Sequence, residues 1–166
     1  QRQMCIRDSS YDELMRVPAL VRAPGVTARE VTRHVSTIDL NRTMTDWMQI
    51  EPDIPSVDSR SLFPLMERGN AGWETPDEVY YRYEWFCGRW YGIRTIRSPD
   101  IKYSFNPVGG DELYDLKKDP GELKNMNRAE SHSTVKREMQ FRLLAHLKAV
   151  QEPLLYPKLR SHMGLG

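Results

Sequence analysis

The sequence predicts an α/β chain in which a strand and a helix precede a four-stranded antiparallel sheet covered by a second helix. Three observations support this. An apolar run at residues 16–22 stops at a Pro-Gly pair and leads into a segment of helical spacing. Four short segments within residues 78–116 alternate in polarity and are separated by turn residues. Residues 131–150 carry an apolar stripe at helical spacing.

The composition is that of a globular protein. Hydrophobic residues make up 39% and charged residues 28% of the 166 residues, which excludes a disordered chain. The formal net charge of +1 lacks the basic excess of a nucleic-acid-binding protein. No stretch approaches the roughly 18 apolar residues that cross a bilayer. The first residues lack the apolar core of a signal peptide, so none is expected at this start.

Residues 10–70 are expected to contain a strand followed by a helix, as in an α/β layer. Residues 1–9, QRQMCIRDS, have no periodicity, and we interpret them as a non-native junction, with an ordinary loose terminus as the alternative. The run at residues 16–22, RVPALVR, predicts a buried strand. The helix that follows begins at Ser36, where Asp39 completes a capping box. SLFPLMERG then predicts a short helical turn or extended piece that ends at Gly69.

Residues 76–156 are expected to form a separate antiparallel subdomain. Its strands are predicted at residues 78–86, 90–97, 101–106 and 112–116, joined by short turns as a meander with one solvent-exposed face. The helix over residues 131–150 would cover the other face with Met139, Leu143, Leu144, Leu147 and Val150. Pro153 stops this helix, and residues 157–166 are expected to be a loose tail.

Metal and thiol chemistry have little support in the residues. Cys5 and Cys87 allow one disulfide at most, and neither belongs to a Cys-x-x-Cys pair. The four histidines are too scattered for a zinc site. The acidic segment at residues 119–122, Asp-Pro-Gly-Glu, lacks the ligand spacing of a calcium loop, and its Pro and Gly positions predict a structural turn.

Four motifs in order resemble the type I sulfatases. ELYDLKKDPGELKNM resembles the closing signature of that family, and RVPALVRAPG followed by HVSTIDLNRTMTDWMQIE resembles an earlier segment of it. SRSLFPLM and WYGIRTIRSPDIKYSFNP resemble two motifs between them. The resemblance covers residues 11–150 and is nearest to bacterial arylsulfatase-like members that act on sulfated carbohydrates or small sulfate esters.

The resemblance implies an alkaline-phosphatase-like fold, of which this chain would be a C-terminal fragment. Residues 10–70 would then be the end of the large α/β domain, with its terminal strand and helix, and residues 76–156 would be the whole small subdomain. Its partners would then be a sulfated small molecule or carbohydrate and the missing N-terminal part of the same protein. The parent protein would be periplasmic or secreted, as many relatives are.

In this family, calcium and a formylglycine made from Cys or Ser perform the hydrolysis of sulfate esters. The resemblance places both in the missing N-terminal part, and no residue of this fragment is expected to bind calcium. Cys5 and Cys87 stand outside the modification motif. The family also has a sulfate-contacting Lys at the position of Arg7, within the junction segment. The fragment alone is therefore expected to be inactive.

The residues left to consider lie beside the substrate or behind the residues that contact it. Tyr11, Asp12 and Arg16 follow the position of the lost Lys and could brace it. The alternative for Arg16 is an ion pair with a carboxylate that holds the start of the strand. Arg89, Trp90 and Arg94 could border an anionic sugar at the ends of a hairpin, with ordinary sheet packing as the alternative.

Two other functions stay open on the sequence. A phosphodiesterase or phosphonate hydrolase of the same superfamily would share this C-terminal region, and the upstream nucleophile would distinguish it. A non-catalytic α+β binding module would fold cooperatively by itself. A fragment, in contrast, would expose an apolar surface where the missing sheet belongs.

Overall fold

The computed structural model describes residues 10–165 except residues 52–58, 74–76, 87–88 and 154, and it leaves the side chains of residues 85–91 undescribed. The chain forms two compact units. The sheet unit consists of the residues up to 17 together with residues 80–166, and the helical unit consists of residues 18–79. The predicted boundaries of the two domains, residues 10–70 and 76–156, stay predictions.

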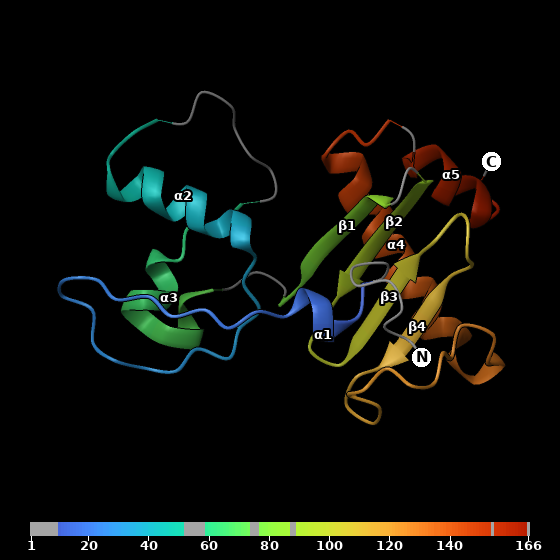
Figure 1. Cartoon of the computed structure of the whole chain (residues 1–166), viewed down its shortest axis with the longest axis horizontal. Helices are drawn as coiled ribbons and strands as arrows, with labels where there is room; N and C mark the ends of the chain where they lie inside the picture. The colour runs from blue at the N-terminus through green and yellow to red at the C-terminus, as the bar shows by residue number, and fades with distance from the viewer. Residues whose placement is uncertain (1–9, 52–58, 74–76, 87–88, 154, 166) are drawn as a thin grey trace. The chain divides into compact units, whose positions relative to one another are not determined.

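The sheet unit is built on the predicted antiparallel meander. Its strands are β1 (Val79–Phe86), β2 (Arg89–Arg97), β3 (Ile101–Phe105) and β4 (Glu112–Asp115), in that spatial order (Figure 1). Each predicted strand is confirmed to within a few residues. Because side chains alternate across a strand, the register fixes which residues share a face. Ile96 lies opposite Tyr103, which lies opposite Leu113.

One face of the sheet is covered by helices, which lie behind it in Figure 1. The short helix η2 (Glu130–His132) leads into α4 (Ser133–Ala149), which confirms the helix predicted over residues 131–150. The core between sheet and helices consists of Ile96, Tyr103, Phe105, Leu113, Met139, Leu143, Leu147, Leu155, Leu159 and Met163. Leu144 and Val150 of the predicted stripe are only half-buried.

The prediction of a loose C-terminal tail was wrong. Helix α5 (Leu155–His162) forms after Pro153, and it buries Leu155 and Leu159 completely. Its end is held by polar contacts as well: His162 Nε2 lies 2.9 Å from Asp111 Oδ2, and Arg137 donates to the Met163 carbonyl at 2.8 Å. Eight residues are too few to show a clear helical period beside a proline, so the sequence pattern did not reveal this helix.

The other face of the sheet was predicted to face solvent, and this prediction was also wrong. Thr95, Lys102 and Ser104 on that face are at most 1% exposed. They are covered by residues 10–12, which lead into the one-turn helix α1 (Asp12–Met15), and by the turn at residues 119–122. The polar residues of this face are therefore buried and hydrogen-bonded to other protein groups, and they are not exposed to water.

The helical unit contains α2 (Thr37–Trp47), α3 (Phe63–Arg68) and the short helix η1 (Gly69–Gly72). The capping box predicted at the start of α2 is confirmed, since the Ser36 N–H donates to the Asp39 carboxylate at 2.7 Å. Helix α3 confirms the predicted helical turn and ends at Gly69, whose φ of 63° favours glycine. The small apolar core of this unit is Leu62, Leu65, Met66 and Trp73.

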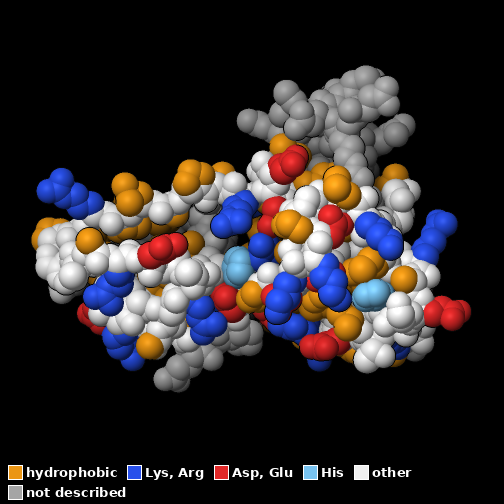
Figure 2. All heavy atoms as spheres, turned by 90° about the horizontal axis from the view of Figure 1, so that it is seen from below, with side chains coloured by type: hydrophobic (Ala, Val, Ile, Leu, Met, Phe, Trp, Pro, Cys, Tyr) orange, Lys and Arg blue, Asp and Glu red, His pale blue; other side chains and the backbone are white. Residues whose placement is uncertain are grey.

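Helix α2 turns a polar face inward. Asp39 is completely buried and accepts the Arg60 N–H at 2.8 Å, and the Thr43 hydroxyl accepts the Leu62 N–H at 2.8 Å. Its large apolar side chains point outward and are 41–59% exposed: Ile38, Leu40, Met44, Trp47 and Met48. Figure 2, which views the molecule from below relative to Figure 1, shows hydrophobic side chains at the surface among Lys and Arg side chains.

The strand predicted at residues 16–22 is absent. These residues have no regular secondary structure, and Val17, Leu20 and Val21 are exposed, Leu20 by 98%. A strand exists only through hydrogen bonds to a neighbouring strand. Among the described residues, every strand belongs to the single sheet β1–β4, and none pairs with this run.

Candidate functional site

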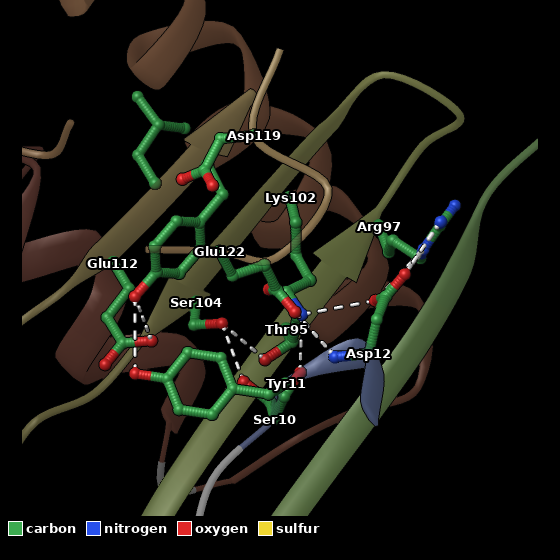
Figure 3. Close-up of polar contacts among 12 residues, drawn as sticks. Ser10, Tyr11, Asp12, Thr95, Arg97, Lys102, Ser104, Glu112, Asp119 and Glu122 are labelled. Carbon is green, nitrogen blue, oxygen red and sulfur yellow. Dashed lines mark hydrogen bonds and ion pairs between the residues drawn. The ribbon is translucent and has the colours of Figure 1, made fainter. Parts of the chain in front are cut away.

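The most elaborate polar site in the described residues lies where residues 10–12 cross the polar face of the sheet (Figure 3). Strand register places two rows of side chains there. One row is Thr95, Ser104 and Glu112, and the other is Arg97, Lys102 and Tyr114. Ser10 joins the first row, since its hydroxyl lies 2.9 Å from the Ser104 hydroxyl, which lies 2.8 Å from that of Thr95.

Asp12 joins the second row. Arg97 and Lys102 are directly opposite each other on β2 and β3, and like charges at such positions repel. The Asp12 carboxylate bridges them. It accepts from Arg97 Nε and Nη2 at 3.0 and 2.8 Å, and from Lys102 Nζ at 3.2 Å. The fork of the guanidinium makes this a directional, charge-assisted contact.

The turn at residues 119–122 supplies the second anion. The Glu122 N–H donates to the Asp119 carbonyl at 3.0 Å, which confirms the predicted turn, and Glu122 adopts a φ of 53°. Its carboxylate forms an ion pair with Lys102 and accepts the Asp12 N–H at 2.6 Å. The side chains of Lys102 and Glu122 are 1% and 2% exposed. We call Asp12, Arg97, Lys102 and Glu122 the ion cluster.

The ion cluster is charge-balanced, with two cations and two anions. Lys102 also donates to the Ser10 carbonyl at 2.7 Å, so its ammonium has protein partners for each of its three protons. Buried charges are tolerated only when they are paired and hydrogen-bonded in this way. The cluster thus fixes residues 10–12 on the sheet and on the turn after β4, at residues that follow Asp12 by 85–110 positions in the chain.

The cluster shifts the titration of two groups. Burial would raise the pKa of the Asp12 carboxyl, but the hydrogen bond from Arg97 and the charges of Lys102 and Arg97 outweigh it and hold that pKa below 3.8. Burial, and then the Asp12 charge, raise the pKa of the nearby Tyr81 hydroxyl to about 12. Asp12 is therefore ionised and Tyr81 neutral at neutral pH.

Asp12 should make the sheet unit acid-sensitive. A carboxyl whose folded-state pKa lies below its unfolded value of 3.8 stabilises the fold above 3.8, and this stabilisation is lost as pH falls through the folded pKa. We expect wild type to lose free energy of unfolding that Asp12→Asn does not lose as pH falls from about 5, through 3.8, toward the lower folded-state pKa. Urea unfolding of both proteins across this range measures the difference. A difference that stays constant with pH would contradict the assignment.

The candidate residues from the sequence fall in different places. Tyr11 lies at the edge of the cluster, where its ring packs on Tyr114 at 6.0 Å and its hydroxyl accepts from that of Tyr114 at 3.4 Å. Arg16 ends α1 and its side chain is exposed. Arg94 is buried at the helix-covered face and pairs with Glu84 and Glu152. Arg89 and Trp90 belong to β2, but their side chains lie outside the described residues.

A role for Arg94 at a sugar is not favoured by these contacts, because its guanidinium already donates to two carboxylates and to the Ile93 carbonyl. The substrate-side roles of Tyr11, Arg16, Arg89, Trp90 and Arg94 stay predictions. A disulfide between Cys5 and Cys87, and the identity of residues 1–9, also lie outside the described residues.

The described residues do not form a metal site. No group of three or more His, Cys, Asp or Glu among them could hold a metal ion. The carboxylates of the site face protein donors instead: Asp12 and Glu122 face cations, and Asp119 accepts the N–H groups of Leu123 and Lys124 at 3.0 and 2.8 Å. Within the same residues, every helix is too short or too polar to cross a membrane.

Sequence reasoning missed Lys102, Arg97 and Glu122. At alternating positions of a strand, Lys102 and Arg97 have the pattern of a solvent-facing row. Only the turn signal before Glu122 hinted at a fixed geometry. No local pattern links these residues to Asp12.

Comparison with known proteins identifies the family. The family described as N-sulphoglucosamine sulphohydrolase, C-terminal, matches residues 7–149. The chain is 33% identical over 136 residues to the Delta 4,5-hexuronate-2-O-sulfatase of Bacteroides thetaiotaomicron, and covers 27% of that protein. A crystal structure of a putative sulfatase from the same species matches with a TM-score of 0.70 and 29% identity, over 87% of this chain and 32% of that one.

A further solved structure, with 25% identity and a TM-score of 0.58 over 70% of this chain and 24% of that one, is of a protein in complex with its substrate D-glucosamine-2-N,6-O-disulfate. In each case the chain spans between about a quarter and a third of the relative's length. The matched region includes the ion cluster, the helical unit and the sheet unit as far as the end of α4. The chain therefore belongs to the sulfatases, and it is a member of the family that forms their C-terminal region.

Proposed function

We propose that this chain is the C-terminal part of an enzyme that hydrolyses sulfate esters of carbohydrates. The observation that carries the proposal is the family match over residues 7–149. Its support for a carbohydrate comes from the relatives, one a hexuronate 2-O-sulfatase and another solved with a disulfated glucosamine. An aryl sulfate or another small sulfate ester is the alternative within the same chemistry.

The groups that perform the hydrolysis would lie in the part of the protein before Tyr11. Calcium there would act as a charge clamp on the sulfate oxygens, and formylglycine would supply the nucleophile. The ion cluster of this chain would hold residues 10–12, the segment that connects that part to the sheet unit. The chain alone would be inactive, because no described residues form a metal site and neither cysteine lies in a formylglycine motif.

We further propose that the apolar face of α2 and the exposed run at residues 16–22 pack on the N-terminal part of the same protein. Ile38, Leu40, Met44, Trp47 and Met48 form an unusually large exposed apolar set for a single short helix. The polar side of the helix, with Asp39 and Thr43, is already buried within the helical unit. The run at residues 16–22 would then be the terminal strand of the large sheet once a neighbouring strand is present.

Met44→Lys tests this contact in two proteins. In the 166-residue chain Met44 is 59% exposed, so we expect the free energy of unfolding to change by less than about 0.5 kcal/mol. In the longer protein the new ammonium would be buried without a partner, and we expect destabilisation of at least about 2 kcal/mol. Thermal and urea unfolding measure both. Glu67→Lys, at an exposed position of α3, is the control, and equal effects of Met44→Lys in the two proteins would contradict the contact.

The function itself is tested with the longer protein encoded by the gene, produced with formylglycine maturation and calcium. We expect release of sulfate from N- and 6-O-sulfated glucosamine or from 2-O-sulfated hexuronate, and no release by the 166-residue chain. Preferential hydrolysis of a phosphodiester or phosphonate ester would overturn the proposal in favour of phosphorus chemistry. Sulfate release by the 166-residue chain would overturn the placement of the catalytic groups.

A further inference from the structure

The polar face of the sheet has a shape and charge that require the segment at residues 10–12. Without that segment, Arg97 and Lys102 would stand opposite each other with Glu122 as the only anion of the ion cluster. With it, Asp12 adds the second negative charge that balances the two cations, and the Ser10 carbonyl accepts a hydrogen bond from the Lys102 ammonium. The face is thus electrostatically incomplete until this segment is in place.

All three residues of the segment make specific contacts with the sheet or with the turn that follows it. The Ser10 hydroxyl and carbonyl, the Tyr11 ring, and the N–H and carboxylate of Asp12 all have partners on β2–β4 or the turn that follows β4 (Figure 3). After α1, residues 16–23 have no regular secondary structure, and most of them are exposed. The chain is therefore held at residues 10–12, passes through α1 and then has no regular structure over residues 16–23.

We propose that the ion cluster positions the catalytic part of the enzyme: Asp12, Arg97, Lys102 and Glu122 hold residues 10–12 so that the chain entering at Ser10 has one fixed position relative to the small sheet. This inference rests on the proposed function, in which the catalytic groups lie before Tyr11. The four residues touch no substrate in this role. They are positioning residues, and they act through the backbone that they hold.

The consequence for catalysis follows from geometry. Displacement of reacting groups by about 1 Å can reduce rate by about 100-fold. A segment held by charge-assisted contacts on its backbone and on its side chains moves less than one held by packing alone. Loosening it should therefore lower kcat more than it raises KM, because the groups that bind the rest of the substrate are not part of the cluster.

The test compares three variants of the longer protein, matured and calcium-loaded. Asp12→Asn removes the bridging charge, Asp12→Glu keeps it, and Glu13→Gln changes the adjacent, exposed carboxylate. We expect Asp12→Asn to lower kcat by at least ~10-fold with KM changed less than ~3-fold. Hydrogen exchange at the Leu14 and Arg16 amides, which bond to Tyr11 and Asp12 carbonyls, should quicken in the same variant. Asp12→Glu should recover most of both properties, and Glu13→Gln should match wild type.

Each result decides the matter. If Asp12→Asn accelerates exchange but keeps wild-type kcat, the positioning role is overturned. If exchange at these amides is unchanged, the anchoring itself is overturned. Should Asp12→Asn fail to fold, Ser10→Ala, which loses only the hydroxyl contact to Ser104, provides the same two readouts. A wild-type protein without activity on any sulfate ester overturns the proposed function, an outcome that no variant can imitate.

Discussion

Lys102→Met is expected to destabilise the 166-residue chain by about 3–5 kcal/mol. Lys102 is completely buried and is the ion partner of both Asp12 and Glu122. The methionine would fit in volume, but the buried Glu122 carboxylate would lose its cation, and Arg97 would be the only cation left in the ion cluster. An uncompensated buried charge has a large desolvation penalty, whereas the hydrophobic gain from the new side chain is small. Urea unfolding followed by circular dichroism measures the change.

Two further variants make this prediction specific. Lys118→Met removes an ion pair with Asp115 in which Lys118 is 82% exposed, and we expect a change below about 1 kcal/mol. Adding Glu122→Gln to Lys102→Met removes the orphaned carboxylate and leaves the Asp12–Arg97 pair balanced. The double variant should therefore be more stable than Lys102→Met alone, with a coupling energy of about 0.5–3 kcal/mol. Strictly additive effects would show that the ion cluster does not act as a unit.

Leu159→Ala is expected to destabilise the sheet unit by about 2–5 kcal/mol. Leu159 belongs to α5 and is completely buried in the core beneath the sheet. Its truncation would remove buried apolar surface and leave a cavity among side chains that α4 and the sheet hold in place. The melting temperature and the free energy of unfolding measure this effect.

The control for Leu159→Ala is Leu123→Ala. Leu123 is 72% exposed just after the turn at residues 119–122, so we expect a change within about 0.5 kcal/mol. If both variants lost the same small amount of stability, α5 would be a loose tail as the sequence predicted. A large effect confined to Leu159→Ala would establish the helix as part of the core.

Much of the secondary structure could be predicted because its causes are local. The alternation of residues in β3, such as Tyr103 between Lys102 and Ser104, is set by the two-residue period of a strand. The start of α2 is set by Ser36 and Asp39, three residues apart. The stripe on α4 reports its buried face through Met139, Leu143 and Leu147. Each pattern is complete within a few residues of chain.

The family could be predicted only from the resemblance, because hydrophobic periodicity and turn signals do not distinguish one family from another. Four short motifs in order predicted a sulfatase C-terminal region, and the family match over residues 7–149 confirmed it. The terminal strand that the resemblance also predicted, at residues 16–22, is absent: these residues have no regular secondary structure, and no strand among the described residues pairs with them.

What the sequence by itself determined was the set of strands and main helices, the turns between them and the family. Only the tertiary structure decided that the polar row of the sheet is buried under residues 10–12, and that the tail returns to the core as α5. The reason is physical: a charged residue at an alternating strand position has the same local pattern whether water or an opposite charge covers it. The opposite charge that covers Arg97 and Lys102 is that of Asp12, which precedes them by 85 and 90 residues in the chain.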